Sequence, residues 1–291
     1  MTILVAGAGS FLGRALISEL DAVQLGEMSI LKRCEPVAKN CNHDQRNIHC
    51  VDMIGNSLLK KDTRYDTIFL LSTVYSRNLE KMEEMVKCNI QFLANIMKLS
   101  PSNGGHIIYT NSYMALPSIL NIGSSLYAKS KDFFSKIAEE FSIHNNIAFD
   151  NIYLFDVIGP NDSRKKFLNL VAESYVKKIT MQASKGDQLI APISASDAAR
   201  CLKSRVGQGK IGLSSNWLLH GDVFVTIREL VAIVENIYCI SIPIEWGNSD
   251  SSVDQVFTKP CDFPNIAANL QNQSLECIIR SVVDPILGAL D

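Results

Sequence analysis

Residues 2–13 decide the fold: they read Thr-Ile-Leu-Val-Ala-Gly-Ala-Gly-Ser-Phe-Leu-Gly, an apolar run that ends in a glycine-rich turn. The run over residues 2–6 predicts a buried parallel strand, and residues 13–20 have helical spacing. Between a strand and a helix, glycine permits a sharp turn and a close approach to a phosphate. We interpret this turn as a site for the pyrophosphate of a dinucleotide, with an ordinary glycine turn as the alternative. Its expected cofactor contacts are Gly7, Gly9, Ser10, Phe11, Leu12 and Gly13.

Apolar runs and helical patterns alternate along the rest of the first half of the chain. We expect strands over residues 28–31, 48–51, 66–71, 106–109 and 148–155, and helices over 80–99 and 126–141. This alternation predicts an α/β fold, a Rossmann-type doubly wound parallel sheet with helices on both faces.

Beyond residue 157 the pattern changes. We expect helices over residues 167–178, 195–204 and 227–237, with short strands near 217–219 and 242–245. Thr226 and Glu229 have the spacing of a capping box at the start of the third helix. We therefore expect a dinucleotide-binding Rossmann domain over residues 1–157 and a smaller C-terminal α/β substrate lobe over 158–291, from which some segments return to the sheet.

The composition is that of an ordinary globular protein. Lys and Arg number 28 against 30 Asp and Glu in 291 residues, so the formal net charge is −2. Such a balance favours neither a nucleic acid nor a membrane surface as partner. The N-terminus lacks a basic leader and no apolar run has membrane-spanning length, so we expect a cytoplasmic protein with reduced cysteines.

A cluster of Cys and His residues raises the question of a metal. Its spacing contains no C-x-x-C pair, so we predict no metal site, with zinc as the alternative. The cluster comprises Cys34, Cys41, His43, His49 and Cys50.

Two charged positions bear on which dinucleotide binds. Lys32 and Arg33 end the second strand, where a carboxylate that binds the ribose of NAD would stand. Cations suit the 2′-phosphate, so NADP(H) is favoured over NAD(H), with a solvated pair as the alternative. Asp52 ends the third strand, where it either accepts a hydrogen bond from the adenine amino group or forms a turn.

The predicted catalytic pair is Tyr127 and Lys131, which lie at i and i+4 on a predicted helix and so share one face. A nearby ammonium favours the phenolate and is expected to lower the pKa of Tyr127, as suits a proton-transfer group. Lys129, at i+2, faces away. Ser112 directly follows the fifth strand and is expected to hold a substrate oxygen, unless it is only a turn serine. Thr110 is a substitute whose side chain we expect to point elsewhere.

Together these residues resemble the extended short-chain dehydrogenase/reductases, the NAD-dependent epimerase/dehydratase family. Ser10 stands where that family usually has glycine. Within the family the likeness is greatest to CDP-abequose and CDP-paratose synthases, which reduce a nucleotide-linked 4-keto sugar with NADPH. Matching segments are Leu70–Thr73, Asn89, 110–113, Phe155–Pro160, 159–162, 185–188 and 194–199.

The resemblance implies site residues and a homodimer. Further cofactor contacts would be Met53, Leu71, Ser72, Thr73, Asn89, Phe155 and Val157, and Asn89 would also order the active-site helix. Substrate contacts would be Thr73, Tyr75, Ser112, Tyr113, Asp156, Arg164, Lys165 and Lys166, although the last three also fit a solvated helix start. Related enzymes often dimerise through two helices, here over residues 80–99 and 126–141.

The resemblance implies NADPH-dependent reduction of a nucleotide-linked 4-keto-deoxysugar, with Tyr127 as proton donor. Tyr113-Met114 follows Ser112 where the family's dehydratases carry Asp-Glu, which argues against dehydration. One alternative is a nucleotide-sugar 4-epimerase that retains NAD. Another, of a different class, is a non-catalytic protein that senses the NADP redox state.

Overall fold

The computed structural model describes most of the chain. The described residues are 1–21, 27–33, 47–51, 64–76, 79–101, 103–120, 125–162, 164, 166–247 and 255–288. None of the helices within these ranges is long and apolar enough to cross a membrane.

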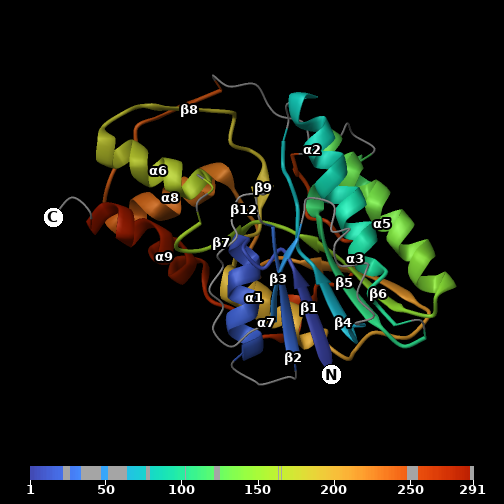
Figure 1. Ribbon diagram of the computed structural model, residues 1–291. Coiled ribbons are helices and arrows are strands. Elements are labelled where there is room, and N and C mark those ends of the chain that lie inside the picture. The colour runs from blue at the N-terminus through green and yellow to red at the C-terminus, as the bar shows by residue number, and fades with distance from the viewer. Residues whose placement is uncertain are drawn as a thin grey trace.

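A seven-stranded sheet, parallel throughout, forms the centre of the molecule (Figure 1). Its order is β11-β6-β5-β4-β1-β2-β3. The inner strands are buried on both faces, which is why they appear in the sequence as continuous apolar runs. The strands are β1 Thr2–Ala6, β2 Glu27–Arg33, β3 Asn47–Val51, β4 Thr67–Leu70, β5 His106–Ser112, β6 Ala148–Leu154 and β11 Ser214–Leu219. The predicted Rossmann-type doubly wound fold is therefore confirmed.

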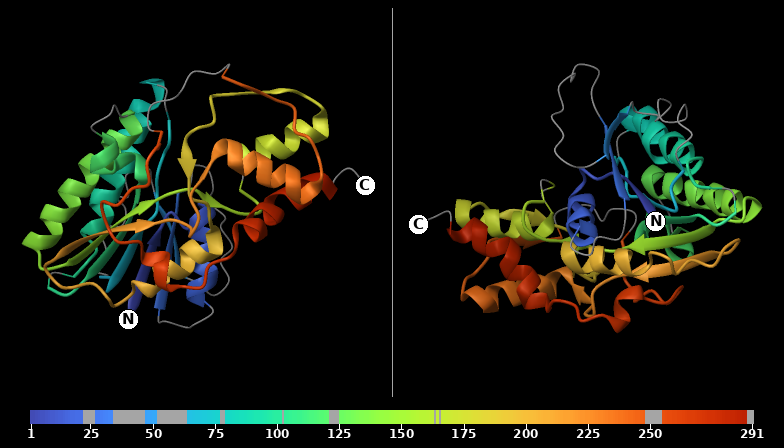
Figure 2. Two further views of the ribbon diagram at one scale, coloured as in Figure 1. Left: turned by 180° about the vertical axis from the view of Figure 1, so that it is seen from behind. Right: turned by 60° about the horizontal axis from the view of Figure 1, so that its bottom comes forward.

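Helices cover both faces of the sheet (Figure 2), and each face has its own apolar core. One face carries α1 Phe11–Asp21 and α7 Ala195–Ser204, which pack on each other. The other carries α2 Met82–Val86, α3 Leu93–Met97 and α5 Leu126–His144. The helix expected over residues 80–99 is thus interrupted, because Lys87–Phe92 form a π-helical stretch between α2 and α3.

The C-terminal lobe has a separate core, built around α6 Phe167–Lys177, α8 Ile227–Tyr238 and α9 Leu275–Leu287. These three helices gather on one side of the sheet in Figure 1. Its short strands are β8 Met181–Ala183, β9 Leu189–Ile190, β12 Val225–Thr226 and β13 Ile244–Trp246, and β7 Val157–Ile158 pairs with β10 Ile193–Ser194 nearer the sheet. The capping box of Thr226 and Glu229 is confirmed, with both reciprocal hydrogen bonds present.

Two parts of the chain beyond residue 157 belong to the sheet layer. The strand β11 extends the sheet beside β6, and α7 covers β1 together with α1. Short elements connect the layers: α4 Pro117–Leu120 and 3-10 turns at Leu79–Lys81, Tyr113–Ala115 and Ile266–Asn269.

A buried polar network closes the edge of the sheet opposite the carboxyl ends. Asp150 accepts hydrogen bonds from Arg205 at 2.9 Å and from the Trp217 indole at 3.0 Å, and it contacts His106 Nε2 at 3.0 Å. Burial raises the pKa of Asp150, but His106 and Arg205 together lower it below its ordinary value. The network joins β5, β6 and β11 to the residue that ends α7.

Candidate active site

A cavity of about 390 Å³ opens at the carboxyl ends of the strands, beside the N-terminus of α1. Doubly wound sheets bind ligands at this edge, because the loops after the strands converge there. The described residues that line it are Ser10, Phe11, Leu12, Leu71, Thr73, Tyr75, Thr110, Asn111, Ser112, Tyr113, Met114, Tyr127, Lys131, Leu154, Phe155, Asp156, Val157, Arg164 and Lys166. The structure thus brings together most of the residues singled out in the sequence.

The glycine-rich turn is packed too closely for side chains at two positions. Gly7 has a φ of +96°, and a Cβ there would lie 2.6 Å from the backbone nitrogen of Ser72. A Cβ on Gly13 would lie 2.2 Å from the carbonyl oxygen of Gly7. The hydroxyl of Ser10 accepts a hydrogen bond from the Gly13 N–H at 3.0 Å. The N–H groups of Phe11 and Leu12, in the first turn of α1, have no partner within the helix, and both residues line the cavity, so the turn fits a dinucleotide pyrophosphate.

Tyr127 and Lys131 lie on the buried face of α5, as their spacing predicts. Ser125 starts this helix, and its hydroxyl accepts a hydrogen bond from the Ala128 N–H at 3.2 Å. Only 8% of Tyr127 and 2% of Lys131 is exposed, and both line the cavity. The helix therefore presents one phenol and one amine at the carboxyl edge of the sheet.

The amine of Lys131 is held against β5. Its Nζ donates a hydrogen bond to the Thr110 carbonyl oxygen at 2.7 Å and lies 4.5 Å from the centroid of the Tyr109 ring. Burial lowers the pKa of Lys131 to about 7, because removal from water disfavours the charged form. A group with this pKa changes its charge readily near neutral pH.

The phenol of Tyr127 has different neighbours from those expected. Burial raises its pKa, whereas hydrogen bonds with the hydroxyls of Thr73 and Ser112 and the charge of Arg164 lower it. We expected Lys131 to be the group that lowers this pKa. In this structure the buried ammonium is held by the Thr110 carbonyl oxygen, so the effect of Lys131 on the pKa of the phenol stays a prediction.

Ser112 is the last residue of β5, so this strand runs three residues further than predicted. Its hydroxyl accepts a hydrogen bond from the Met114 N–H at 3.3 Å and lies within hydrogen-bonding reach of Tyr127. Thr110 points elsewhere, as expected, and its hydroxyl donates to the Leu70 carbonyl oxygen at 3.2 Å. Of the two candidates, Ser112 is therefore the hydroxyl beside the phenol.

Asn89 joins the helix layer to the site. It is fully buried in the π-helical stretch, where its side chain accepts from the Val74 N–H at 2.7 Å and donates to the Val74 carbonyl oxygen at 2.9 Å. The same amide donates to the Ser130 hydroxyl on α5 at 3.2 Å, and the Thr73 hydroxyl donates to its oxygen at 3.3 Å. It does not line the cavity, so its geometry is that of a positioning residue rather than a cofactor contact.

Charged groups gather at the end of the cavity nearest the C-terminal lobe. Lys166 precedes α6, and its Nζ donates to the Val157 carbonyl oxygen at 2.7 Å. Burial lowers the pKa of Lys166 and raises that of Asp156, and each charge opposes the effect of burial on the other. Arg164 also lines the cavity, whereas Lys165 lies outside the described residues.

Aromatic side chains form the walls beside the phenol. The Tyr75 ring meets the Tyr127 ring edge-on, with centroids 4.9 Å apart, and Tyr113 stacks on Phe155 at 5.1 Å. Sequence reasoning weighed Thr110 only as a substitute for Ser112, and it assigned no role to three further lining residues: Asn111, Met114 and Leu154. The continuation of β5 to Ser112 is the signal that would have found Asn111, because it carries the strand's last residues to the cavity.

Several predicted contacts have no described side chain. Lys32 and Arg33 are the last two residues of β2, and only their backbone is described. Asp52 and Met53 lie outside the described residues, as do Cys34, Cys41 and His43 of the Cys–His cluster. In the described part of the chain, no three His, Cys, Asp or Glu side chains form a group that could hold a metal ion.

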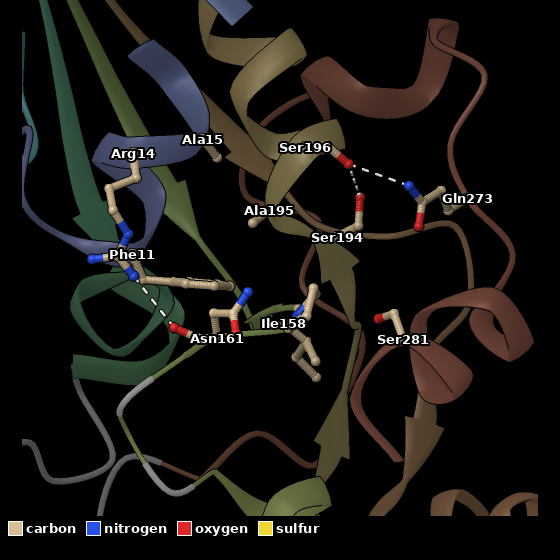
Figure 3. A pocket seen from close by; sticks show the side chains of 12 residues that line it. Phe11, Arg14, Ala15, Ile158, Asn161, Ser194, Ala195, Ser196, Gln273 and Ser281 are labelled. Atoms are coloured by element: carbon tan, nitrogen blue, oxygen red, sulfur yellow. Dashed lines mark hydrogen bonds between the residues drawn. The ribbon is translucent and has the colours of Figure 1, made fainter. Parts of the chain in front are cut away.

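A second cavity of about 390 Å³ lies behind Phe11, which lines both (Figure 3). Its polar groups come from the starts of α7 and α9: the Ser194 and Ser196 hydroxyls are 3.0 Å apart, and Gln273 donates to Ser196 at 3.2 Å. Arg14 closes one side (Figure 3), donating to the Gly9 carbonyl oxygen at 2.9 Å and the Asn161 carbonyl oxygen at 3.3 Å. It contains none of the three predicted catalytic residues.

Comparisons with known proteins give one family and several structural relatives. The model of the NAD dependent epimerase/dehydratase family matches residues 3–204. A CDP-abequose synthase from Salmonella typhimurium is 22% identical over 193 residues, which are 64% of this chain and 64% of that protein. This chain therefore matches slightly less than two thirds of the length of that relative.

Two solved structures illustrate the likeness in fold. The UDP-glucuronic acid 4-epimerase from Bacillus cereus, in complex with UDP-glucuronic acid and NAD, superimposes with a TM-score of 0.80 at 16% identity, over 99% of this chain and 100% of that one. RMD from Pseudomonas aeruginosa, complexed with NADPH, has a TM-score of 0.70 at 14% identity, over 99% and 96% of the two chains. At these identities the likeness establishes the fold and leaves the chemistry to the site.

Proposed function

Because the chain belongs to the NAD dependent epimerase/dehydratase family, we propose that it is an NADPH-dependent reductase of a nucleotide-linked 4-keto-deoxysugar. It is an NAD(P)-dependent enzyme of the short-chain dehydrogenase/reductase type. The observation that carries the proposal is the convergence of the Tyr127 phenol with the hydroxyls of Ser112 and Thr73, in the cavity that also borders the glycine-rich turn.

The residues of this chain supply the proton and hold the oxygen. A nicotinamide bound along the cavity would supply a hydride to the carbonyl carbon. Tyr127 donates its phenolic proton to the carbonyl oxygen, and Ser112 donates a hydrogen bond to the same oxygen. Lys131 is the cation that stabilises the phenolate left behind, which requires it to leave the Thr110 carbonyl oxygen.

The walls of the cavity suit a deoxygenated sugar ring and the anionic diphosphate of a nucleotide that stays attached to it. Tyr75 and Tyr113 offer apolar surface to the cavity, whereas Asp156 and Lys166 offer charge. Lys166 suits a phosphate of the nucleotide, and the Asp156 carboxylate suits a hydroxyl donor. The similarity to a CDP-abequose synthase supports a CDP-linked substrate.

Reduction is favoured over dehydration by the residues that follow Ser112. Tyr113 and Met114 both line the cavity there, and neither carries a carboxyl group for proton abstraction. Among the described lining residues, the one carboxylate is Asp156, and it interacts with Lys166. A preference for NADPH rests on Lys32 and Arg33 at the end of β2.

The first test is NADPH oxidation at 340 nm with CDP-, UDP- and dTDP-linked 4-keto-6-deoxy and 4-keto-3,6-dideoxy sugars, each compared with NADH. We expect turnover with at least one CDP-linked sugar. Tyr127→Phe should reduce kcat at least about 10³-fold, since it removes the proton donor. Its affinity for NADPH should stay within a few-fold. Lost cofactor binding in this variant would contradict the role given to the phenol.

A second candidate is a nucleotide-sugar 4-epimerase that keeps NAD bound. It is supported by the likeness in fold to the epimerase that was solved with NAD. Release of stoichiometric NAD on acid denaturation of the purified protein, with no net NADPH oxidation on any sugar, would favour this candidate over the reductase.

We also propose that the protein is a homodimer. Four apolar side chains project from the helix layer over α2 and α5 and are each between 39% and 54% exposed: Met82, Val86, Phe133 and Ile137. Side chains of this kind, gathered on neighbouring helices, suit a helix-to-helix contact between two copies.

A further inference from the structure

Arg164 lies beside the glycine-rich turn although it is 150 residues away in sequence. Its guanidinium carbon is 5.5 Å from the centroid of the Phe11 ring, and Phe11 is the first residue of α1. Arg164, Ser10 and Leu12 line the same cavity. A guanidinium is thus placed across from the N-terminus of α1, where the geometry of the turn accommodates a pyrophosphate.

The position of this guanidinium is fixed by its neighbours. Asp162 accepts from Arg164 Nε at 2.8 Å, from Nη2 at 2.7 Å and from the Arg164 backbone N–H at 3.1 Å. The Asp162 side chain is 3% exposed, whereas that of Arg164 is 58% exposed, so the guanidinium is the member of the pair that can turn towards a ligand. Asn161, which precedes Asp162, is held to the glycine-rich turn by Arg14. The Arg14 guanidinium donates to the carbonyl oxygens of both Asn161 and Gly9 (Figure 3).

A diphosphate carries two negative charges, and a cation close to this turn would stabilise it further. The dipole of α1 contributes only a partial positive charge, and the guanidinium of Arg14 donates to two backbone carbonyl oxygens. The pair with Asp162 uses Nε and one N–H of Nη2, so the planar fork of Arg164 keeps N–H groups for phosphate oxygens. Its charge also lowers the pKa of Tyr127, and both residues line the same cavity.

We propose that Arg164 clamps the diphosphate of the dinucleotide against the N-terminus of α1, with Asp162 as its resting partner. The inference rests on the proposed cofactor, and it reassigns Arg164 from the substrate, as the sequence suggested, to the cofactor. The substrate end of the cavity keeps Lys166 and Asp156 as its charged groups.

The test is calorimetric titration of the full-length protein with four probes: NADP⁺, ADP-ribose, adenosine 2′,5′-bisphosphate and CDP. ADP-ribose carries the cofactor's diphosphate, and the bisphosphate lacks it. Arg164→Gln should weaken binding of NADP⁺ and ADP-ribose about tenfold, as expected for the loss of a charge-assisted hydrogen bond. Binding of the bisphosphate, and of CDP to protein saturated with NADP⁺, should not change. Arg280→Gln, which removes a comparable exposed guanidinium on α9, is the matched control.

Asp162→Asn tests the resting partner. The amide oxygen can still accept from the Arg164 backbone N–H, but a negative charge beside the diphosphate is removed, so ADP-ribose should bind about threefold more tightly. Unchanged or weaker binding would overturn this part of the proposal.

The remaining outcomes separate the clamp from the proposed function. Unaltered NADP⁺ affinity in Arg164→Gln would overturn the clamp and leave the proposed function standing. Weakened CDP binding with unaltered NADP⁺ binding would return Arg164 to the substrate. Failure of the unsubstituted protein to bind either NADP⁺ or NAD⁺ would overturn both proposals.

Discussion

At the scale of single residues, burial of the Lys131 ammonium lowers the stability of the folded protein. Its ammonium is buried with a carbonyl oxygen and the face of Tyr109 as its partners, and burial lowers its pKa to about 7 from an ordinary 10.5. Between these two pH values the unfolded chain binds more protons than the folded protein does. The free energy of unfolding therefore rises with pH across this window, and the penalty is largest below pH 7.

This penalty can be measured by urea unfolding at pH 7.5, 8.5 and 9.5 with no dinucleotide added. We expect the free energy of unfolding of the unsubstituted protein to rise relative to that of Lys131→Met by up to about 1.4 kcal/mol per pH unit. Lys136→Met, on the same helix but 71% exposed, should follow the unsubstituted protein. If the free energy of unfolding changed with pH in the same way for Lys131→Met and the unsubstituted protein, Lys131 would have the same pKa in the folded and unfolded states, which would contradict this prediction.

Element by element, the π-helical stretch Lys87–Phe92 does the most to position the site. One side chain from it, Asn89, bonds both backbone groups of Val74 after β4 and the hydroxyl of Ser130 on α5. The π-helical stretch thus places the buried Asn89 side chain where it contacts both the segment after β4 and α5. Since Ser130 lies one residue before Lys131, a shift at this junction moves the catalytic face of α5.

Asn89→Leu should therefore affect stability and catalysis together. The unpaired N–H and carbonyl of Val74 should lower the free energy of unfolding by about 2–4 kcal/mol. Displacement of the phenol should lower kcat about 100-fold with a smaller change in KM. Ser130→Ala removes only the hydrogen bond between Asn89 and Ser130, so it should lower the free energy of unfolding by about 1 kcal/mol. Its loss of activity should be smaller than that of Asn89→Leu. Full kcat in a destabilised Asn89→Leu protein would show that the residue is merely structural.

The elements also show how far sequence reasoning reaches. The buried strands β1, β4, β5 and β6 begin within one residue of prediction, because burial on both faces leaves an apolar run that is visible in the sequence. The π-helical stretch and α9 were not predicted, because an apolar helical pattern does not reveal its hydrogen-bond register or its tertiary partners. The site follows the same rule: Tyr127 and Ser112 could be placed from their elements, whereas the resting contact of Lys131 depends on packing.

At the scale of the whole molecule, the cavity lies where the sheet layer meets the C-terminal lobe. Its walls are formed by residues at the ends of sheet strands and by Arg164 and Lys166, which precede α6. The face formed by α2 and α5 lies on the opposite side of the molecule from α6, α8 and α9 (Figure 1). A second copy on that face would therefore leave the C-terminal lobe uncovered.

The proposed dimer predicts a mass of about twice 32.2 kDa in sedimentation equilibrium. Val86→Glu with Phe133→Glu should shift it to the monomer, because charges would be buried in an apolar interface that cannot pair them. Ile211→Glu, at a 62% exposed position outside the helix layer, should leave the dimer intact. Because α5 carries both Phe133 and the catalytic pair, the monomeric variant should also lose thermal stability at α5 and hence activity. An unsubstituted protein that sediments at 32.2 kDa would contradict the dimer and leave the exposed apolar stripe for another partner.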